Sequence, residues 1–392
     1  MKEIQVIGDL AINGAPPAFE QPLHVGRPNI GSRKKFLQYA NEIFDQKWFS
    51  NNGPTVQELE KQLSEYLQVK HCIAMCNGTI ALEIAIRALG LKGEVIVPSY
   101  TFVATAHALQ WQEITPIFAD IDPKTHTLDP EAVQRMITPR TTGIIGVHLW
   151  GRPCDVEGLQ KVADDHGLQL MFDAAHAFSC SYQGKMLASF GRCEVFSFHA
   201  TKFFNTFEGG MVATNDDDLA KQIRLMQNFG FAGTDNVIYP GTNGKMNEMS
   251  AAMGLTGLES LEDFLAINKQ NYLHYKKGID AIKGLTIVEY NEAEKNNFQY
   301  IVIEVDDDFP FNRDQLVDVL QAENILARKY FWPGCHKMEP YRSLYPHTEH
   351  MLTNTRIVAD RVAVLPTGTG MDEESIVFII KLLTILVNTT SS

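Results

Sequence analysis

Short apolar runs alternate with amphipathic stretches from residue 72 to residue 173, and this alternation restricts the fold more than any other feature. The runs have the length of strands, whereas the stretches between them carry apolar residues at helical spacing. The run 143–149 is almost continuously apolar, as expected of a parallel strand that is covered on both faces. The order of elements therefore predicts an α/β fold with a doubly wound, mostly parallel sheet. The expected strands are residues 72–75, 95–98, 116–119, 143–149 and 169–173, and the expected helices are residues 80–89, 102–110, 131–137 and 156–166.

A second, smaller part is expected beyond the alternating region. A chain of 392 residues is too long for one small core. After about residue 268 the pattern changes to that of a smaller α+β unit, and one long helix over residues 250–277 is expected to bridge the two parts. The sequence predicts a large domain over residues 1–265, including an irregular N-terminal arm, and a small C-terminal domain over residues 266–392. Helices are also expected at residues 32–47 and 56–67, and apolar runs at residues 285–288, 300–305 and 316–320.

Composition and charge exclude several classes of protein. The formal net charge is −13 and the sequence has no basic stripe, so a nucleic-acid-binding protein is not expected. No basic-then-apolar leader opens the sequence and no apolar run approaches ~20 residues, so neither secretion nor a membrane span is expected. The six cysteines form no CxxC pair, which fits a reduced, cytoplasmic protein. The apolar stretch 379–387 is expected to form a buried final helix.

Polar residues stand where the expected strands end. Asn77, Ser99, His148 and Asp173 each close or follow an apolar run. In a doubly wound sheet, ligands bind outside the carboxyl ends of the strands, so these residues are candidates for a site. An unpaired buried carboxylate at Asp173 would cost several kcal/mol, so it needs a partner. A protonated pyridine nitrogen, an arginine or a helix terminus could each be the partner of this carboxylate.

The turn Asn77-Gly78-Thr79 opens an expected helix. Free backbone amides and the positive end of the helix dipole can bind an anion there, and Thr79 can add a hydroxyl donor. A plain strand-to-helix turn explains the same residues equally well. The sequence has no dinucleotide-binding glycine fingerprint, no P-loop and no nucleophile elbow.

Lys202 lies between two apolar runs, residues 196–198 and 211–214, rather than on a charged helix face. A partly desolvated lysine can lose its proton and form a Schiff base, although a loop lysine that faces water is the simpler interpretation of this residue alone. A phosphate site, an acidic partner for a ring nitrogen and a Schiff-base lysine are the three parts that a pyridoxal-phosphate (PLP) enzyme needs.

Five motifs occur in a fixed order. They are Asn-Gly-Thr at 77–79, Pro-Ser-Tyr-Thr-Phe-Val-Ala-Thr at 98–105, Asp-Ala-Ala-His-Ala at 173–177, Ser-Phe-His-Ala-Thr-Lys at 197–202 and Glu-Gly-Gly at 208–210. With these motifs the chain resembles the DegT/DnrJ family of nucleotide-sugar aminotransferases, from about residue 51 to residue 341. The resemblance implies the fold-type I architecture, with a large PLP-binding domain and a smaller C-terminal domain, and it implies PLP as the cofactor.

The resemblance also implies roles for single residues in holding the cofactor. Lys202 would be the Schiff-base lysine, and Asp173 would pair with the pyridine nitrogen. His176 stands beside the ring oxygen, where the family more often has glutamine. The other implied contacts are Phe102 stacked on the ring, Gly78, Thr79 and Ser197 at the phosphate, and Asn243 reaching the phosphate from the other subunit of a homodimer.

The chain departs from the family pattern at three positions. Phe172 replaces the glutamate that commonly precedes the aspartate, Phe207 replaces a glycine, and Trp332 is unusual in its motif. These departures concern the substrate pocket more than the cofactor. Family members that act as dehydratases carry histidine at the position of Lys202, so the lysine argues against that activity.

The stretches 243–248 and 329–342 resemble the branch that aminates carbon 4 of dTDP-4-keto-6-deoxy-D-glucose. That resemblance implies L-glutamate as donor, dTDP-4-amino-4,6-dideoxy-D-glucose as product, and a role in deoxysugar or surface-polysaccharide biosynthesis such as that of lipopolysaccharide O-antigen. Tyr330, His336 and Tyr341 are then candidate substrate-binding residues, with loop packing as the alternative. The remaining alternatives are amination at carbon 3, another nucleotide sugar, or a PLP-binding regulatory protein without turnover.

Overall fold

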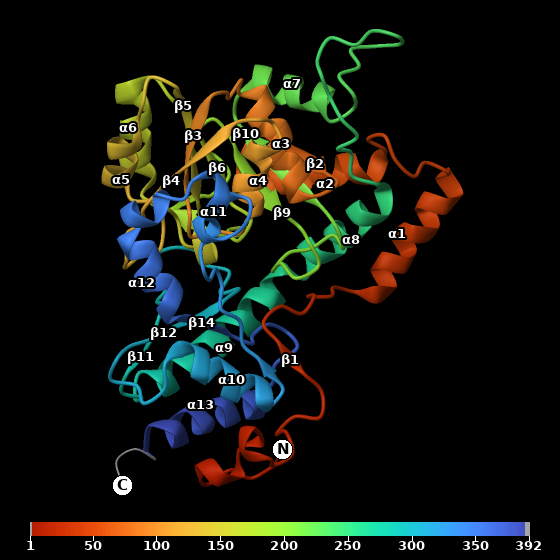
Figure 1. Cartoon of the computed structure of the whole chain (residues 1–392). Helices are drawn as coiled ribbons and strands as arrows, with labels where there is room; N and C mark the ends of the chain where they lie inside the picture. The colour runs from red at the N-terminus through yellow and green to blue at the C-terminus, as the bar shows by residue number, and fades with distance from the viewer. Residues whose placement is uncertain (1, 389–392) are drawn as a thin grey trace.

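A seven-stranded sheet forms the centre of the computed structural model, which describes residues 2–388 (Figure 1). The strand order is β2-β10-β9-β6-β5-β3-β4. Strand β10 is antiparallel to both of its neighbours, and the other neighbouring pairs are parallel. The predicted α/β fold with a mostly parallel sheet is therefore confirmed. The strands are β2 (His71–Met75), β3 (Glu94–Pro98), β4 (Thr115–Ala119), β5 (Thr141–Val147), β6 (Gln169–Asp173), β9 (Glu194–Ser197) and β10 (Gly210–Thr214).

Helices cover both faces of this sheet because successive residues of each strand point to opposite sides. In β2, Ile73 and Met75 pack with α3, α4 and α7, whereas Cys72 and Ala74 pack with α2 and α8. Helices α5 and α6 cover the second face near β5 and β6. The bounds are α2 (Pro54–Leu67), α3 (Gly78–Ala88), α4 (Ala104–Gln110), α5 (Pro130–Met136), α6 (Val156–His166), α7 (Asp217–Met226) and α8 (Glu248–Glu259).

Several helices begin where a short polar side chain accepts a free backbone N–H of the first turn. Ser32 caps α1 (Arg33–Gln46), and Asn77 caps α3 by accepting the N–H of Ile80. The other caps of this kind are Asp129, Asp155, Asp216, Asn247 and Asn312, before α5, α6, α7, α8 and α10 (Arg313–Ala322). Such local signals explain why most predicted helix starts lie within a few residues of the observed ones.

The prediction of one long helix over residues 250–277 is wrong. Two helices occupy this region, α8 and α9 (Leu261–Ile279), and Ser260 separates them. The N–H of Ser260 bonds to the carbonyl of Gly257 in a tighter turn, which ends the α-helical pattern. The sequence gives little warning, because no proline or glycine stands at the break and the apolar periodicity continues across it.

A second core surrounds a three-stranded antiparallel sheet of β11 (Leu285–Ile287), β12 (Ile301–Val305) and β14 (Val362–Leu365). Helices α9, α10 and α13 (Glu373–Asn388) pack around it, and Figure 1 shows them below the large sheet. The predicted run 316–320 belongs to α10, and the run 379–387 is buried in α13 as expected. The remaining elements include β1 (Leu23–His24), β13 (Ile325–Leu326), α11 (Tyr341–Leu344) and α12 (Thr353–Arg361).

The N-terminal arm lies beside this smaller part. Ile4, Leu10 and Phe19 are buried in the same core as α9 and α13, and Figure 1 shows the N-terminus next to α13. We propose that the two domains divide near residue 265, as expected from the sequence. The arm, which was expected in the large domain, is attached to the smaller one. Support for the division is that α8 packs on α1 and α2, whereas α9 packs on α13.

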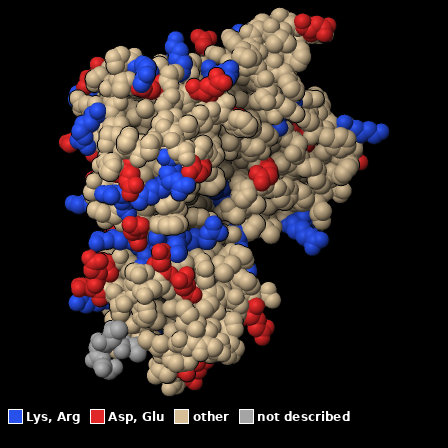
Figure 2. All heavy atoms as spheres, viewed as in Figure 1, with Lys and Arg blue, Asp and Glu red and all other residues tan. Residues whose placement is uncertain are grey.

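Within residues 2–388, every helix is too short or too polar to cross a membrane. On the face that Figure 2 shows, basic and acidic side chains are interspersed rather than gathered into one basic region.

Candidate active site

A cavity of about 700 Å³ opens where β6 and β9 end and α3 begins. The large sheet supplies most of its wall, and Tyr300, Tyr330 and Phe331 line it from the smaller part. Most of the site residues predicted from the sequence meet here, namely Gly78, Thr79, Phe102, Asp173, His176, Ser197, Lys202 and Tyr330.

Asp173 is the last residue of β6, and its carboxylate is buried but only partly satisfied. Oδ2 accepts a hydrogen bond of 2.7 Å from the hydroxyl of Thr105, and Oδ1 accepts one of 3.1 Å from the N–H of Ala175. Burial raises the pKa of Asp173, while these two bonds and the charge of Lys202 act in the opposite direction. A carboxylate in this position can stabilise a cationic N–H group within the cavity.

Lys202 lies in the loop between β9 and β10, is half-buried, and lines the cavity. Burial lowers the pKa of Lys202 to about 8, and the nearby Asp173 opposes the shift. Within residues 2–388, no hydrogen-bond partner holds its Nζ. The amine is therefore available in its neutral, nucleophilic form near neutral pH, and the interpretation as a water-facing loop lysine does not hold.

The N-terminus of α3 and the end of β9 approach each other closely at one end of the cavity. A Cβ atom on Gly78 would lie 3.0 Å from Cβ of Ser197, so only glycine fits this approach without displacing a neighbour. Asn77 accepts the N–H of Ile80, whereas the preceding N–H groups of the first turn have no partner within the helix. Free N–H groups, the helix dipole and the hydroxyls of Thr79 and Ser197 together suit a phosphate group.

Stacked rings form the wall beside His176. Its imidazole lies nearly parallel to the rings of Trp150 and Phe331, with centroid distances of 6.0 Å and 5.9 Å. Burial, with the charge of Lys202, lowers the pKa of His176 well below its ordinary value, so the ring is neutral. It can offer a hydrogen bond to a ligand without adding a charge.

Three predicted residues do not line the cavity. Asn243 is exposed, and its segment lies along Cys76, which donates its N–H to Gly244. His336 is buried against Ser99, and its Nδ1 lies 2.7 Å from that hydroxyl. Tyr341 is buried with its hydroxyl 2.6 Å from Nδ1 of His107. For the last two, these contacts favour the loop-packing alternative.

The structure adds site residues that sequence reasoning missed. Thr105 binds Asp173 from outside the cavity lining, and its place in the motif at 98–105 was the available signal. Tyr300 and Phe331 reach the cavity from the smaller part, and no local pattern marks them.

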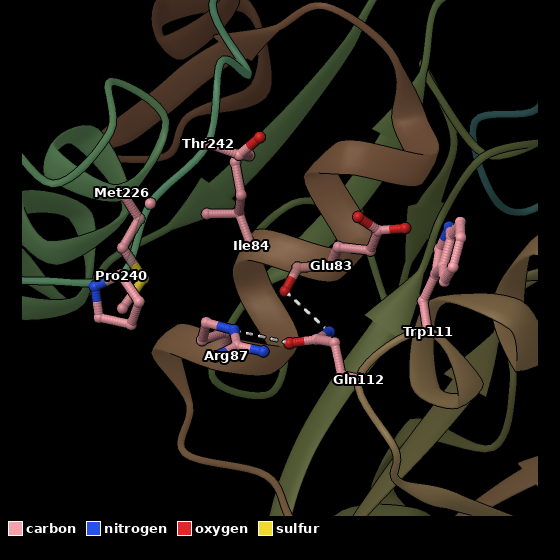
Figure 3. A pocket seen from close by; sticks show the side chains of 9 residues that line it. Glu83, Ile84, Arg87, Trp111, Gln112, Met226, Pro240 and Thr242 are labelled. Atoms are coloured by element: carbon pink, nitrogen blue, oxygen red, sulfur yellow. Dashed lines mark hydrogen bonds between the residues drawn. The ribbon is translucent and has the colours of Figure 1, made fainter.

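A second hollow of about 310 Å³ adjoins the cavity, and Glu83 and Trp111 line both. Figure 3 shows Arg87 and Gln112 beside these residues, joined by a hydrogen bond of 3.0 Å. This hollow thus carries the charged side chains of Glu83 and Arg87.

Comparison with known proteins identifies the family. The pattern of the DegT/DnrJ/EryC1/StrS aminotransferase family matches residues 31–384. The chain belongs to this family. It is therefore an aminotransferase by descent, as the motifs predicted.

Individual relatives of this aminotransferase cover almost all of its length. It is 38% identical to the dTDP-4-amino-4,6-dideoxy-D-glucose transaminase of Shigella dysenteriae over 92% of the chain and 98% of the relative. It is 35% identical to the GDP-perosamine synthase of Caulobacter vibrioides over 90% of the chain and 95% of the relative. The crystal structure of DesI, determined in the presence of its TDP-sugar product, superposes with a TM-score of 0.94 at 45% identity, covering 98% of each chain.

This aminotransferase family implies PLP, and the cavity fits that cofactor. Asp173 is a buried carboxylate that can face the ring nitrogen, and Lys202 is an unpaired amine with a lowered pKa. The close approach of Gly78 to Ser197 brings the free N–H groups of α3 beside the Ser197 hydroxyl, a combination that suits a phosphate. Phe102 exposes its ring to the cavity, as a stacking residue must.

Proposed function

We propose that this aminotransferase moves the amino group of L-glutamate to carbon 4 of dTDP-4-keto-6-deoxy-D-glucose, giving dTDP-4-amino-4,6-dideoxy-D-glucose. The observation that carries the reaction type is the meeting of Lys202, Asp173 and the N-terminus of α3 in one cavity. The substrate rests on two relatives at 38% identity, both dTDP-4-amino-4,6-dideoxy-D-glucose transaminases, and on the TDP-sugar product of DesI.

PLP would be held by the residues described above. Lys202 would bind it through Nζ, Asp173 would pair with the pyridine N–H, and Phe102 would stack on one face of its ring. Gly78, Thr79 and Ser197 would receive its phosphate. When bound, PLP supplies an electron sink and a carrier for the amino group, which are functions that no side chain can perform.

Lys202 would also move protons. Its Nζ, when free in the cavity, would remove a proton from Cα of glutamate. The same Nζ would deliver a proton to carbon 4 of the sugar. A pKa lowered to about 8 suits both steps, because each protonation state is then accessible near neutral pH.

Asp173 would stabilise the positive charge on the ring nitrogen throughout. Its bonds to Thr105 and Ala175 favour the ionised carboxylate against the effect of burial, which raises the pKa, and they fix its direction. Over the full cycle glutamate is oxidised to 2-oxoglutarate and the sugar ketone is reduced to an amine, so no external oxidant or reductant is needed.

The substrate side of the cavity would be formed by residues from the smaller part. Tyr330 lines the cavity, and its backbone carbonyl is held by the hydroxyl of Tyr100, so it is our candidate for contact with the sugar. His336 and Tyr341 would act indirectly, by holding the segment that follows Tyr330 against β3 and α4.

A homodimer would complete the site. Asn243 is exposed outside the cavity of its own chain, next to a loop that carries exposed Phe229 and Phe231. In a second copy it would reach the phosphate near Gly78. Mixing the inactive variants Lys202→Ala and Asn243→Ala should then restore activity, because one site of each mixed dimer has both native residues. Activity no higher than that of Asn243→Ala alone would contradict the shared site.

Two experiments test the activity. Lys202→Ala should abolish turnover together with the ~400 nm band of the lysine-bound cofactor, and an unchanged spectrum would contradict the assignment. NMR analysis of the product formed from dTDP-4-keto-6-deoxy-D-glucose and glutamate should show an amine at carbon 4. Amination at carbon 3, or no turnover, would refute the specific substrate.

A second candidate substrate is a GDP-linked sugar, since the chain is 35% identical to a GDP-perosamine synthase. Competition between dTDP- and GDP-linked keto sugars decides between the two. A cytoplasmic location is also proposed, supported by six unpaired cysteines.

A further inference from the structure

Glu194 carries a fully buried carboxylate that the proposed reaction does not use. It lies in β9, three residues before Ser197. Oε1 accepts hydrogen bonds of 2.8 Å from the N–H groups of Ala188 and Phe190. Oε2 faces Nε2 of His148 at 3.3 Å, and within residues 2–388 neither of these two atoms has a hydrogen-bond partner elsewhere. Burying an ionised carboxylate costs folding free energy, so a carboxylate buried away from the reaction is expected to have another role.

The contacts of His148 fix the position of its proton. Nδ1 accepts a hydrogen bond of 3.0 Å from the backbone N–H of Cys154, so Nδ1 itself cannot carry a hydrogen. The Cys154 thiol donates to the carbonyl of Val147. A neutral imidazole therefore carries its proton on Nε2, 3.3 Å from Oε2 of Glu194. The Cys154 N–H and the Glu194 carboxylate both favour this tautomer and this orientation of the ring.

His148 connects this pair to the active site in two ways. Its own N–H donates to the carbonyl of Asp173 at 2.9 Å, which holds the ends of β5 and β6 together. Its bond to Cys154 closes a short turn that carries Trp150, whose backbone has φ 62° and ψ 11°. Such a conformation persists only where the surroundings enforce it. The Trp150 ring stacks on the cavity residues His176 and Phe331.

The location of Glu194 also accounts for a departure seen in the sequence. Glu194 is the register partner of Phe172 across β6 and β9, and the Phe172 ring stacks on His148 with centroids 4.6 Å apart. Phe172 stands where a glutamate commonly precedes the aspartate. In this chain a carboxylate lies on the neighbouring strand, on the same face of the sheet, and faces His148.

We propose that Glu194 is a positioning residue of this aminotransferase. Through His148 it fixes the backbone at Asp173 and the turn that carries Trp150. These two segments in turn hold Asp173 and the stacked rings of His176 and Phe331 in place in the cofactor cavity. The expected effect on catalysis rests on the proposed function. The contacts of Glu194 with His148 are those of the protein without cofactor and do not depend on it.

The wild-type protein gives the first test. Nitrogen-15 NMR of labelled histidine, assigned with His148→Gln, should show a hydrogen on Nε2 of His148 throughout the neutral pH range in cofactor-free protein. The Nδ1–H tautomer would overturn the proposal. This measurement needs no activity, so it stands even if the proposed substrate is wrong.

Glu194→Gln gives the second test. A glutamine cannot accept from two backbone N–H groups and also from Nε2–H of His148, because one end of its amide is a donor. We expect affinity for PLP and kcat each to fall about tenfold, with KM for glutamate unchanged, as for supporting residues around other sites. Glu323→Gln is the matched control, since Glu323 is equally buried and accepts two backbone N–H groups far from the cavity. If both variants lose stability alike and both keep PLP affinity, Glu194 is merely structural and the proposal fails.

Discussion

The hydrogen bond from Thr105 to Asp173 should set the acidic limit of activity. At 2.7 Å and fully buried, it is a bond to an ionised acceptor, worth roughly 1.5–3 kcal/mol. The bond favours the ionised carboxylate and so lowers the pKa of Asp173. Thr105→Val keeps the shape and removes the donor, so the pKa of Asp173 must rise. Since one pH unit corresponds to 1.36 kcal/mol, the acidic limb of the pH profile should move upward by about one to two pH units.

The assay is kcat/KM for glutamate as a function of pH, with the absorption of bound cofactor followed over the same range. Thr355→Val is the matched control, because the hydroxyl of Thr355 donates to the buried carboxylate of Asp120 at 2.8 Å, away from the cavity. It should leave the acidic limb in place. The reasoning is refuted if Thr105→Val leaves that limb unmoved while the protein stays folded, or if both variants move it equally.

Three further outcomes follow from the site. Gly78→Ala should weaken PLP binding about tenfold in a dialysis measurement, because its Cβ would lie 3.0 Å from Cβ of Ser197; unchanged affinity would place the phosphate elsewhere. Tyr330→Phe should raise KM for the sugar nucleotide and not for glutamate, and equal changes in both would argue against sugar contact. The rate at which PLP binds cofactor-free protein should rise with pH and level off above about 8, since burial lowers the pKa of Lys202 and only the neutral amine reacts; a flat stopped-flow profile would contradict this.

Much of the fold follows from local pattern. The strands at 143–149 and 169–173 and the helix at 156–166 are encoded by runs and periodicities within single elements, and the structure reproduces them within a few residues. The break at Ser260 is the counterexample. No local signal marks it, and the two helices on either side pack against different partners, α1 and α2 for one and α13 for the other.

The identities of the chemical residues were also available from the sequence. Asp173 and the Asn77-Gly78-Thr79 turn stand at strand ends, and Lys202 lies in the loop that follows β9. Strand ends of a parallel sheet meet at one edge, so their convergence could be predicted. The ordered motifs alone make the aminotransferase family recognisable.

Only the tertiary structure determines the hydrogen bonds and the pKa values of these residues. The Thr105–Asp173 bond spans 68 positions, and the Glu194–His148 contact depends on strand register, which no periodicity specifies. Burial lowers the pKa of Lys202, and the cavity that it lines is formed by the large sheet together with Tyr300 and Phe331 of the smaller part. The sequence by itself determined which groups are present and at which edge of the sheet they lie. Their protonation, direction and partners depend on distances between segments remote in the chain, and only folding brings those segments together.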